Sequence, residues 1–100
     1  MIQIVESHTF IAWIKALRDC TARTRIAVRI RRLQLGNAGD VRPVGDGVSE
    51  LRIHHGPGYR VYLTQRGETF IVLLCGGDKS TQAADIARAK ILAKETYDVE

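Results

Sequence analysis

The residues of this chain that could do chemistry are three cationic side chains and one histidine, which the sequence pattern places around one face of a sheet. Arg52 and His54 alternate with apolar neighbours in one short run, Arg60 lies in the next run, and Lys79 follows a third. Cations can stabilise the charge that develops on a phosphate under attack, and a histidine titrates in the range that proton transfer needs. The set is suited to the cleavage of RNA without a metal ion.

In such a cleavage the 2′-hydroxyl attacks the adjacent phosphate, which requires a base for the hydroxyl proton and an acid for the leaving 5′-oxygen. His54 could act as acid or base, the guanidinium of Arg60 matches phosphate oxygens, and Arg52 and Lys79 add positive charge. Tyr62, from the same face, could stack on a base or donate to a phosphate. From the residues alone, the simpler interpretation is favoured, in which the arginines and Tyr62 only cover the solvent side of a sheet.

Other kinds of site are excluded by spacing. The run Gly76-Gly77-Asp78-Lys79-Ser80 ends in Lys-Ser but lacks the preceding glycine pattern of a nucleotide-binding loop. His54 and His55 are adjacent, so they point to opposite faces of a strand and make a poor metal pair. Cys20 and Cys75 lack metal-ligand spacing, and Cys75 has the surroundings of a small core residue. The sequence therefore predicts neither a metal site nor a cofactor.

The elements that must position these residues follow from periodicity and turn chemistry. Three strands joined by glycine-containing turns form an antiparallel meander, and the third is apolar on both faces, as a central strand is. A short strand and a helical hairpin precede the meander, and a helix capped by Ser80 or Thr81 follows it to about Glu95. The order is β-α-α-β-β-β-α, an α+β fold with the helical hairpin and C-terminal helix packed on a mainly antiparallel four-stranded sheet. The expected ranges are strands 1–5, 48–54, 59–65 and 69–75 and helices from Ser7 or Thr9 to about 20 and from 22 to 35, with a loop at 37–47.

The second helix of the hairpin carries five arginines on its polar face. Arg29 and Arg32 are the candidates for a phosphate track along RNA, and the same face could instead receive an acidic partner or simply be solvated. The formal charge of +4 admits either kind of partner. Trp13, on the first helix, is interpreted as a packing anchor, with base stacking as the alternative.

One hundred residues predict a single domain, residues 1–100. No apolar run reaches the roughly 18 residues of a membrane helix, and the N-terminus lacks the pattern of a signal peptide. We therefore expect a cytoplasmic protein without a membrane partner.

The chain resembles a known group through three runs of residues. It looks like the RelE/ParE superfamily of toxins from type II toxin–antitoxin modules, and most closely like its HigB-like "addiction module killer protein" branch. The resemblance implies a RelE-like fold and a toxin neutralised by a cognate helix-turn-helix antitoxin. The runs that carry it are Val44-Gly45-Asp46-Gly47-Val48-Ser49-Glu50-Leu51-Arg52-Ile53, Gly58-Tyr59-Arg60-Val61-Tyr62, and Leu73-Leu74-Cys75-Gly76-Gly77-Asp78-Lys79-Ser80-Thr81-Gln82 with Asp85-Ile86.

RelE-like members cleave mRNA in the ribosomal A site without a metal. The resemblance places their working groups at Arg52, His54, Arg60 and Lys79, with the ribosome and mRNA as partners. RelE itself has a tyrosine in its last helix that helps to drive the attack, whereas the matching region around Asp85 has none and Tyr97 lies too far along. The general base is thus left open: His54 or Lys79 serves, or the activity is weak, or the target differs. Two other functions are considered: a ParE-like, non-enzymatic inhibitor of DNA gyrase, and a non-toxic co-repressor that binds the antitoxin.

Overall fold

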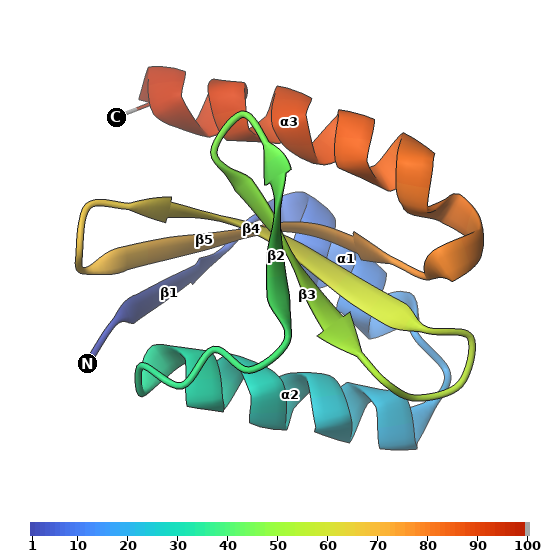
Figure 1. The fold of residues 1–100 in the computed structure, drawn as a ribbon. Helices are drawn as coiled ribbons and strands as arrows, with labels where there is room; N and C mark the ends of the chain where they lie inside the picture. The colour runs from blue at the N-terminus through green and yellow to red at the C-terminus, as the bar shows by residue number, and fades with distance from the viewer. Residues whose placement is uncertain (100) are drawn as a thin grey trace.

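The chain folds into a five-stranded sheet with helices on both faces (Figure 1). The computed structural model describes residues 1–99, with side chains through residue 95, so Glu100 and the side chain of Tyr97 lie outside the described part. The strand order across the sheet is β1-β5-β4-β3-β2. The elements in chain order are β1 (Gln3–Glu6), α1 (His8–Ala16), α2 (Cys20–Gln34), β2 (Val41–Gly45), β3 (Val48–Ile53), β4 (Tyr59–Arg66), β5 (Phe70–Gly77), the 3₁₀ turn η1 (Lys79–Thr81) and α3 (Gln82–Val99).

The predicted α+β class and the mainly antiparallel sheet are confirmed. Strands β3, β4 and β5 form the expected antiparallel meander, and β1 pairs in parallel with β5 at one edge. The predicted number of four strands is wrong, because the segment expected to be a loop contains β2, which pairs with β3 at the other edge. The glycine and proline residues of this segment are typical of a loop, so the strand is not evident from the sequence. Pro43 is tolerated because a residue of an edge strand can lack a hydrogen-bonding N–H group.

Helices α1 and α2 cover one face of the sheet and α3 covers the other (Figure 1). Strand β5 contributes to both resulting cores, as its unbroken apolar sequence predicts. Leu73 packs in the core with Phe10 of α1 and Ile26 of α2, whereas Leu74 packs with Ala89 and Ala93 of α3. The strands are therefore held from both sides, and the polar groups at their ends are placed by a fixed sheet register. Among the described residues, no helix has the length and apolar character that crossing a membrane requires.

Side-chain caps set the helix ends, which differ in part from the prediction. Ser7 accepts a hydrogen bond from the Phe10 N–H at 3.0 Å and begins α1, as expected. The hairpin turns earlier than predicted, because Asp19 accepts from the Ala22 N–H at 3.0 Å and starts α2 at Cys20. Before the last helix, Asp78 caps the 3₁₀ turn η1, in which Ser80 and Thr81 lie, and α3 follows from Gln82 and continues past the expected end to Val99.

Gly76 allows α1 to approach β5. A Cβ atom at this position would overlap the indole ring of Trp13, a rigid group that cannot move aside. Trp13 packs against the core and lies edge-on to Tyr59, with ring centroids 6.4 Å apart, so its predicted role as a packing anchor is confirmed.

We predict that Gly76→Ala lowers the free energy of unfolding by about 1–3 kcal/mol, because the added methyl group overpacks the contact between α1 and β5. Urea denaturation measures the change. Gly67→Asn is the matched control: Gly67 has a φ of +60° with nothing within 4 Å of an added Cβ, and Asn tolerates that conformation. Equal stability of Gly76→Ala and the wild type would show that Trp13 does not pack against Gly76 as described.

Candidate active site

The four residues predicted to be catalytic line one open cavity of about 260 Å³. It lies where β3 ends, β4 begins and η1 starts. Arg52 and Arg60 are direct partners in the β3–β4 register, and the backbone N–H of Lys79 donates to the Pro57 carbonyl at 3.4 Å. This hydrogen bond to the turn between β3 and β4 places Lys79 near the two arginines. The complete lining is Arg52, Ile53, His54, Gly58, Tyr59, Arg60 and Lys79.

A buried carboxylate beneath the cavity fixes the two arginines. Glu50 of β3 is only 1% exposed, and its Oε1 lies 2.9 Å from Arg52 Nε while its Oε2 lies 3.5 Å from Arg60 Nε. Gln82, at the start of α3, donates to Oε2 at 2.9 Å. Burial by itself would raise the pKa of Glu50, but hydrogen bonds from Arg52, Gln82 and Tyr62 outweigh it and lower the pKa. Glu50 is therefore a charged anchor, a role that sequence reasoning missed, although its place on the same face as Arg52 was visible.

This arrangement leaves the cavity positive. Arg52 and Arg60 share one carboxylate, and Lys79 adds an exposed ammonium group. Arg60 is only 8% exposed, and its Nη1 donates to the Gly58 carbonyl at 2.8 Å, so its guanidinium is held rigidly. A phosphate in the cavity would meet fixed cations, which is the geometry that stabilises developing negative charge without reorganisation.

The expectation that Tyr62 faces RNA is wrong. Its side chain is fully buried under α3, and its hydroxyl donates to Glu50 Oε2 at 3.0 Å. Burial, followed by the bond to Glu50, raises the pKa of the Tyr62 hydroxyl well above its usual value. The alternation of β4 identified the correct face, but no local signal indicates that α3 covers that part of it. Tyr62 supports the Glu50 anchor and has no ring surface open to a base.

His54 is paired with a residue that the sequence did not suggest. Its Nε2 lies 2.6 Å from Oδ2 of Asp40, in the segment between α2 and β2. The hydrogen bond with His54 is the largest cause that lowers the pKa of Asp40, so Asp40 is a carboxylate at neutral pH. The neighbouring His55 points the other way and pairs with Asp19 at 3.1 Å. The prediction that the two histidines diverge is confirmed.

A second cavity of about 300 Å³ continues from His54 along α2, and it shares Ile53 and His54 with the first. Arg32 lines it with an exposed side chain, as predicted. Arg29, the other residue predicted for the phosphate track, also borders this cavity, but its guanidinium is turned to the backbone rather than to a ligand. Its guanidinium is half-buried and donates to three backbone carbonyls, those of Arg52, Ala38 and Asp40.

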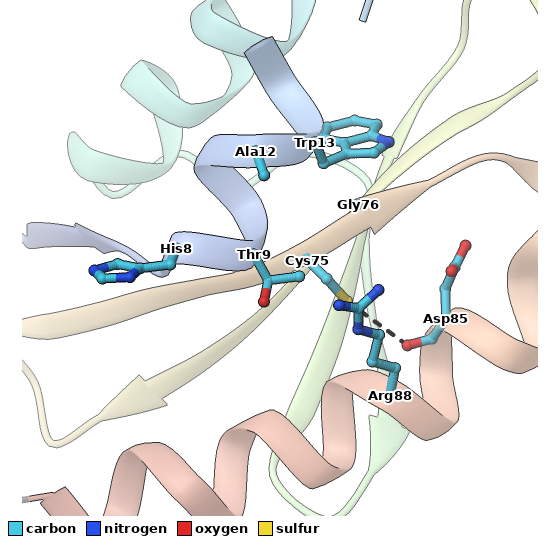
Figure 2. Close-up of a pocket in the computed structure, with 8 residues that line it drawn as sticks. All are labelled: His8, Thr9, Ala12, Trp13, Cys75, Gly76, Asp85 and Arg88. Carbon is cyan, nitrogen blue, oxygen red and sulfur yellow. Dashed lines mark hydrogen bonds between the residues drawn. The ribbon is translucent and has the colours of Figure 1, made fainter. Parts of the chain in front are cut away.

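A third cavity, of about 530 Å³, lies apart from the predicted residues, between α1 and α3 along β5 (Figure 2). Trp13 borders it from α1, and Asp85 and Arg88 border it from α3. Asp85 sits over Gly77, where a Cβ atom would overlap its carboxylate. Within residues 1–95, no group of three or more His, Cys, Asp or Glu side chains is close enough to hold a metal ion.

We predict that Glu50→Gln lowers the free energy of unfolding by about 3 kcal/mol, because it leaves the buried guanidinium of Arg60 and the partly exposed one of Arg52 without their counter-charge. Urea denaturation at neutral pH measures this loss. Glu68→Gln, the same change at an exposed turn residue, should stay within about 0.5 kcal/mol of the wild type.

The same pair of proteins tests the charge of Glu50. A lowered pKa in the folded state stabilises the protein above the unfolded-state value of about 4.3, and this stabilisation is lost as the pH falls through the folded-state pKa. The difference between wild type and Glu50→Gln should therefore be largest at neutral pH and shrink below about pH 4. A difference that is constant with pH would contradict a charged Glu50.

Comparisons with known proteins cover nearly the whole chain. The family model described as "Phage derived protein Gp49-like (DUF891)" matches residues 12–98. An uncharacterized protein of Haemophilus influenzae is 52% identical to this chain over 94 residues, which make up 94% of this chain and 95% of that protein. The family match includes every residue that lines the cavity with Arg52, His54, Arg60 and Lys79.

Proposed function

The chain belongs to the Gp49-like family of phage-derived proteins, a toxin-like family of addiction modules, and on this premise we propose that it is a toxin that cleaves mRNA on the ribosome. One observation carries the proposal: Arg52, His54, Arg60 and Lys79 line a single cavity. Its partner would be a cognate helix-turn-helix antitoxin. An acidic surface on that antitoxin would complement the net charge of +4.

The proposed reaction uses the chain's own side chains. The 2′-oxygen of the RNA attacks the adjacent phosphorus and gives its proton to a base, either His54 or Lys79. Arg52 and Arg60 stabilise the charge on the non-bridging oxygens. The bond from phosphorus to the 5′-oxygen breaks, and that oxygen takes a proton from the other of the two groups. The products are a 2′,3′-cyclic phosphate and a 5′-hydroxyl, so no water or redox partner is consumed.

The second cavity offers a path for the RNA beside the reacting phosphate. It begins at His54, where the first cavity ends, and runs along α2 past Arg32 and Arg25. Both arginines are exposed, and the exposed apolar side chain of Val28 lies between them. This combination of positive charge and apolar surface suits a single strand, whose phosphates and bases need both.

We predict that Lys79→Ala reduces cleavage by on the order of 10²-fold, because it removes a cation and a proton-transfer group from the phosphate. Lys79 is exposed, so the fold should not change. Lys15→Ala, at an exposed position in the last turn of α1, is the matched control and should cleave like the wild type. Primer extension on a translated reporter mRNA, after the toxin is induced alone, measures cleavage.

The same experiment separates the alternatives. Cuts within codons that disappear when translation is blocked support the ribosome-dependent nuclease. Intact mRNA with growth arrest and loss of DNA supercoiling would identify a gyrase inhibitor instead. Intact mRNA with normal growth, together with binding to the operator-bound antitoxin, would identify a co-repressor.

We predict that Arg32→Ala weakens binding of a single-stranded RNA oligonucleotide and lowers the slope of log K against log salt concentration by about 0.7–1. Fluorescence anisotropy at several salt concentrations measures both effects. Arg31→Ala is the control on the same helix, because Arg31 lies outside the second cavity and bonds to Gln34 at 2.9 Å. Equal losses in the two variants would show that α2 attracts RNA only by its overall charge.

A further inference from the structure

We propose that Asp40 is a positioning residue that fixes His54 with its proton on Nε2, so that Nδ1 is the base that accepts the 2′-hydroxyl proton. The catalytic part of this inference rests on the proposed function, whereas the state of the imidazole ring does not. The inference selects His54 over Lys79 as the base and leaves Lys79 to protonate the 5′-oxygen.

The first support is the chemistry of the hydrogen bond itself. Asp40 Oδ2 and His54 Nε2 are 2.6 Å apart, and an ionised carboxylate can only accept hydrogen bonds. The pKa of Asp40 is lowered, first by this bond and then, against the opposing effect of burial, by nearby positive charges, so the carboxylate is ionised. Nε2 must therefore carry the proton that lies between the two atoms. In a neutral imidazole ring Nδ1 is then left as the acceptor.

The second support is that this bond is what orients the ring. The side chain of His54 is 74% exposed, so core packing cannot hold it. Asp40 is less exposed, with 32% of its side chain accessible. His54 borders both the cationic cavity and the α2 cavity, which places its ring beside the proposed path of the RNA.

The third support is that the backbone of Asp40 is itself held in place. The Arg52 N–H donates to the Asp40 carbonyl at 3.1 Å, next to the strand position that leads to His54. Arg29 reaches across from α2 and donates to the carbonyls of Asp40 at 3.3 Å and Ala38 at 3.2 Å, and also to that of Arg52. Arg29 thereby fastens the segment that carries Asp40 to the strand that carries His54.

Gly39 makes this clamp possible. Its φ is +70°, and a Cβ atom there would lie 3.0 Å from Arg29 Nη2. A side chain at this position would crowd the guanidinium group from the carbonyls that it binds. The half-buried guanidinium of Arg29 thus acts on backbone geometry, and through it on the pair Asp40–His54.

In the proposed step the 2′-hydroxyl proton moves to His54 Nδ1 as the oxygen bonds to phosphorus. The imidazolium that forms is stabilised by the Asp40 carboxylate, which keeps its own charge. The 5′-oxygen leaves with a proton from the Lys79 ammonium group, and solvent then returns both groups to their starting states. Asp40 touches no reacting atom, so it acts through His54.

The chain provides its own control in a second pair, Asp19–His55. The distance is 3.1 Å between equivalent atoms, Oδ2 and Nε2, but neither residue lines the two cavities. Asp19 also caps α2, and because Asn caps a helix about as well as Asp, Asp19→Asn should preserve the fold. The same chemical change is therefore available inside and outside the candidate site.

The test is ¹⁵N NMR of the imidazole nitrogens in the full chain without RNA, combined with the translated-mRNA cleavage assay. We expect the wild type to show His54 with the proton on Nε2, and Asp40→Asn to show a mixture of both tautomers, because an amide can donate as well as accept. Cleavage by Asp40→Asn should fall about tenfold to a hundredfold, with Asp40→Glu recovering part of the loss. Asp19→Asn should change only the signals of His55 and leave cleavage unchanged.

Three results would overturn the inference, and each differs from a failure of the proposed function. A wild-type His54 that shows mixed tautomers, or one that Asp40→Asn leaves unaltered, removes the positioning role whether or not RNA is cut. Equal cleavage by Asp40→Asn and wild type removes the assignment of the base to His54. A wild type that shows the expected tautomer but cuts no mRNA refutes the proposed function, and with it the catalytic part alone.

Discussion

The buried charge of Glu50 is the constraint on which the candidate site depends. Taking a carboxylate out of water costs several kcal/mol, and only close, well-placed partners offset that cost. Here the partners come from three elements: Arg52 of β3, Arg60 and Tyr62 of β4, and Gln82 of α3. Glu50 therefore both positions the arginines of the cavity and binds the start of α3 to the sheet.

Because both arginines are paired with Glu50, their guanidinium groups have fixed positions and move little toward a ligand. Arg60 is nearly buried and bound to the turn that precedes it, so it contributes a rigid charge rather than a side chain that can follow a ligand. Lys79, at the start of η1, is exposed and free to adjust. An anion in the cavity would thus contact rigidly held arginines on one side and the mobile ammonium group of Lys79 on the other. This arrangement suits a reaction in which negative charge moves from one oxygen to another.

The fold class could be predicted from the sequence, because strand alternation and turn residues are local signals. The same signals placed Arg52, His54, Arg60 and Lys79 around one face of the sheet. The failures of this prediction concern features that depend on distant segments. Tyr62 was placed on the correct face, but its burial depends on how α3 lies. Arg29 was placed on the polar side of α2, but its partners are backbone carbonyls, which have no signature in a sequence. Strand β2 was missed because Pro43, Gly45 and the flanking glycines resemble a loop, although an edge position accepts a proline.

The adjacent histidines show how one local fact acquires meaning only from the fold. Their adjacency excluded a shared metal ion, since neighbouring strand residues point apart. The same divergence sends His55 to Asp19 at the start of α2 and His54 to Asp40 beyond its end. The two residues that follow β3 are thereby bound to residues before and after α2. The His54–Asp40 pair borders the two cavities through His54, and Arg29 holds the segment after α2, which carries Asp40, against β3. Arg29 thus keeps Asp40 beside the histidine that lines the two cavities.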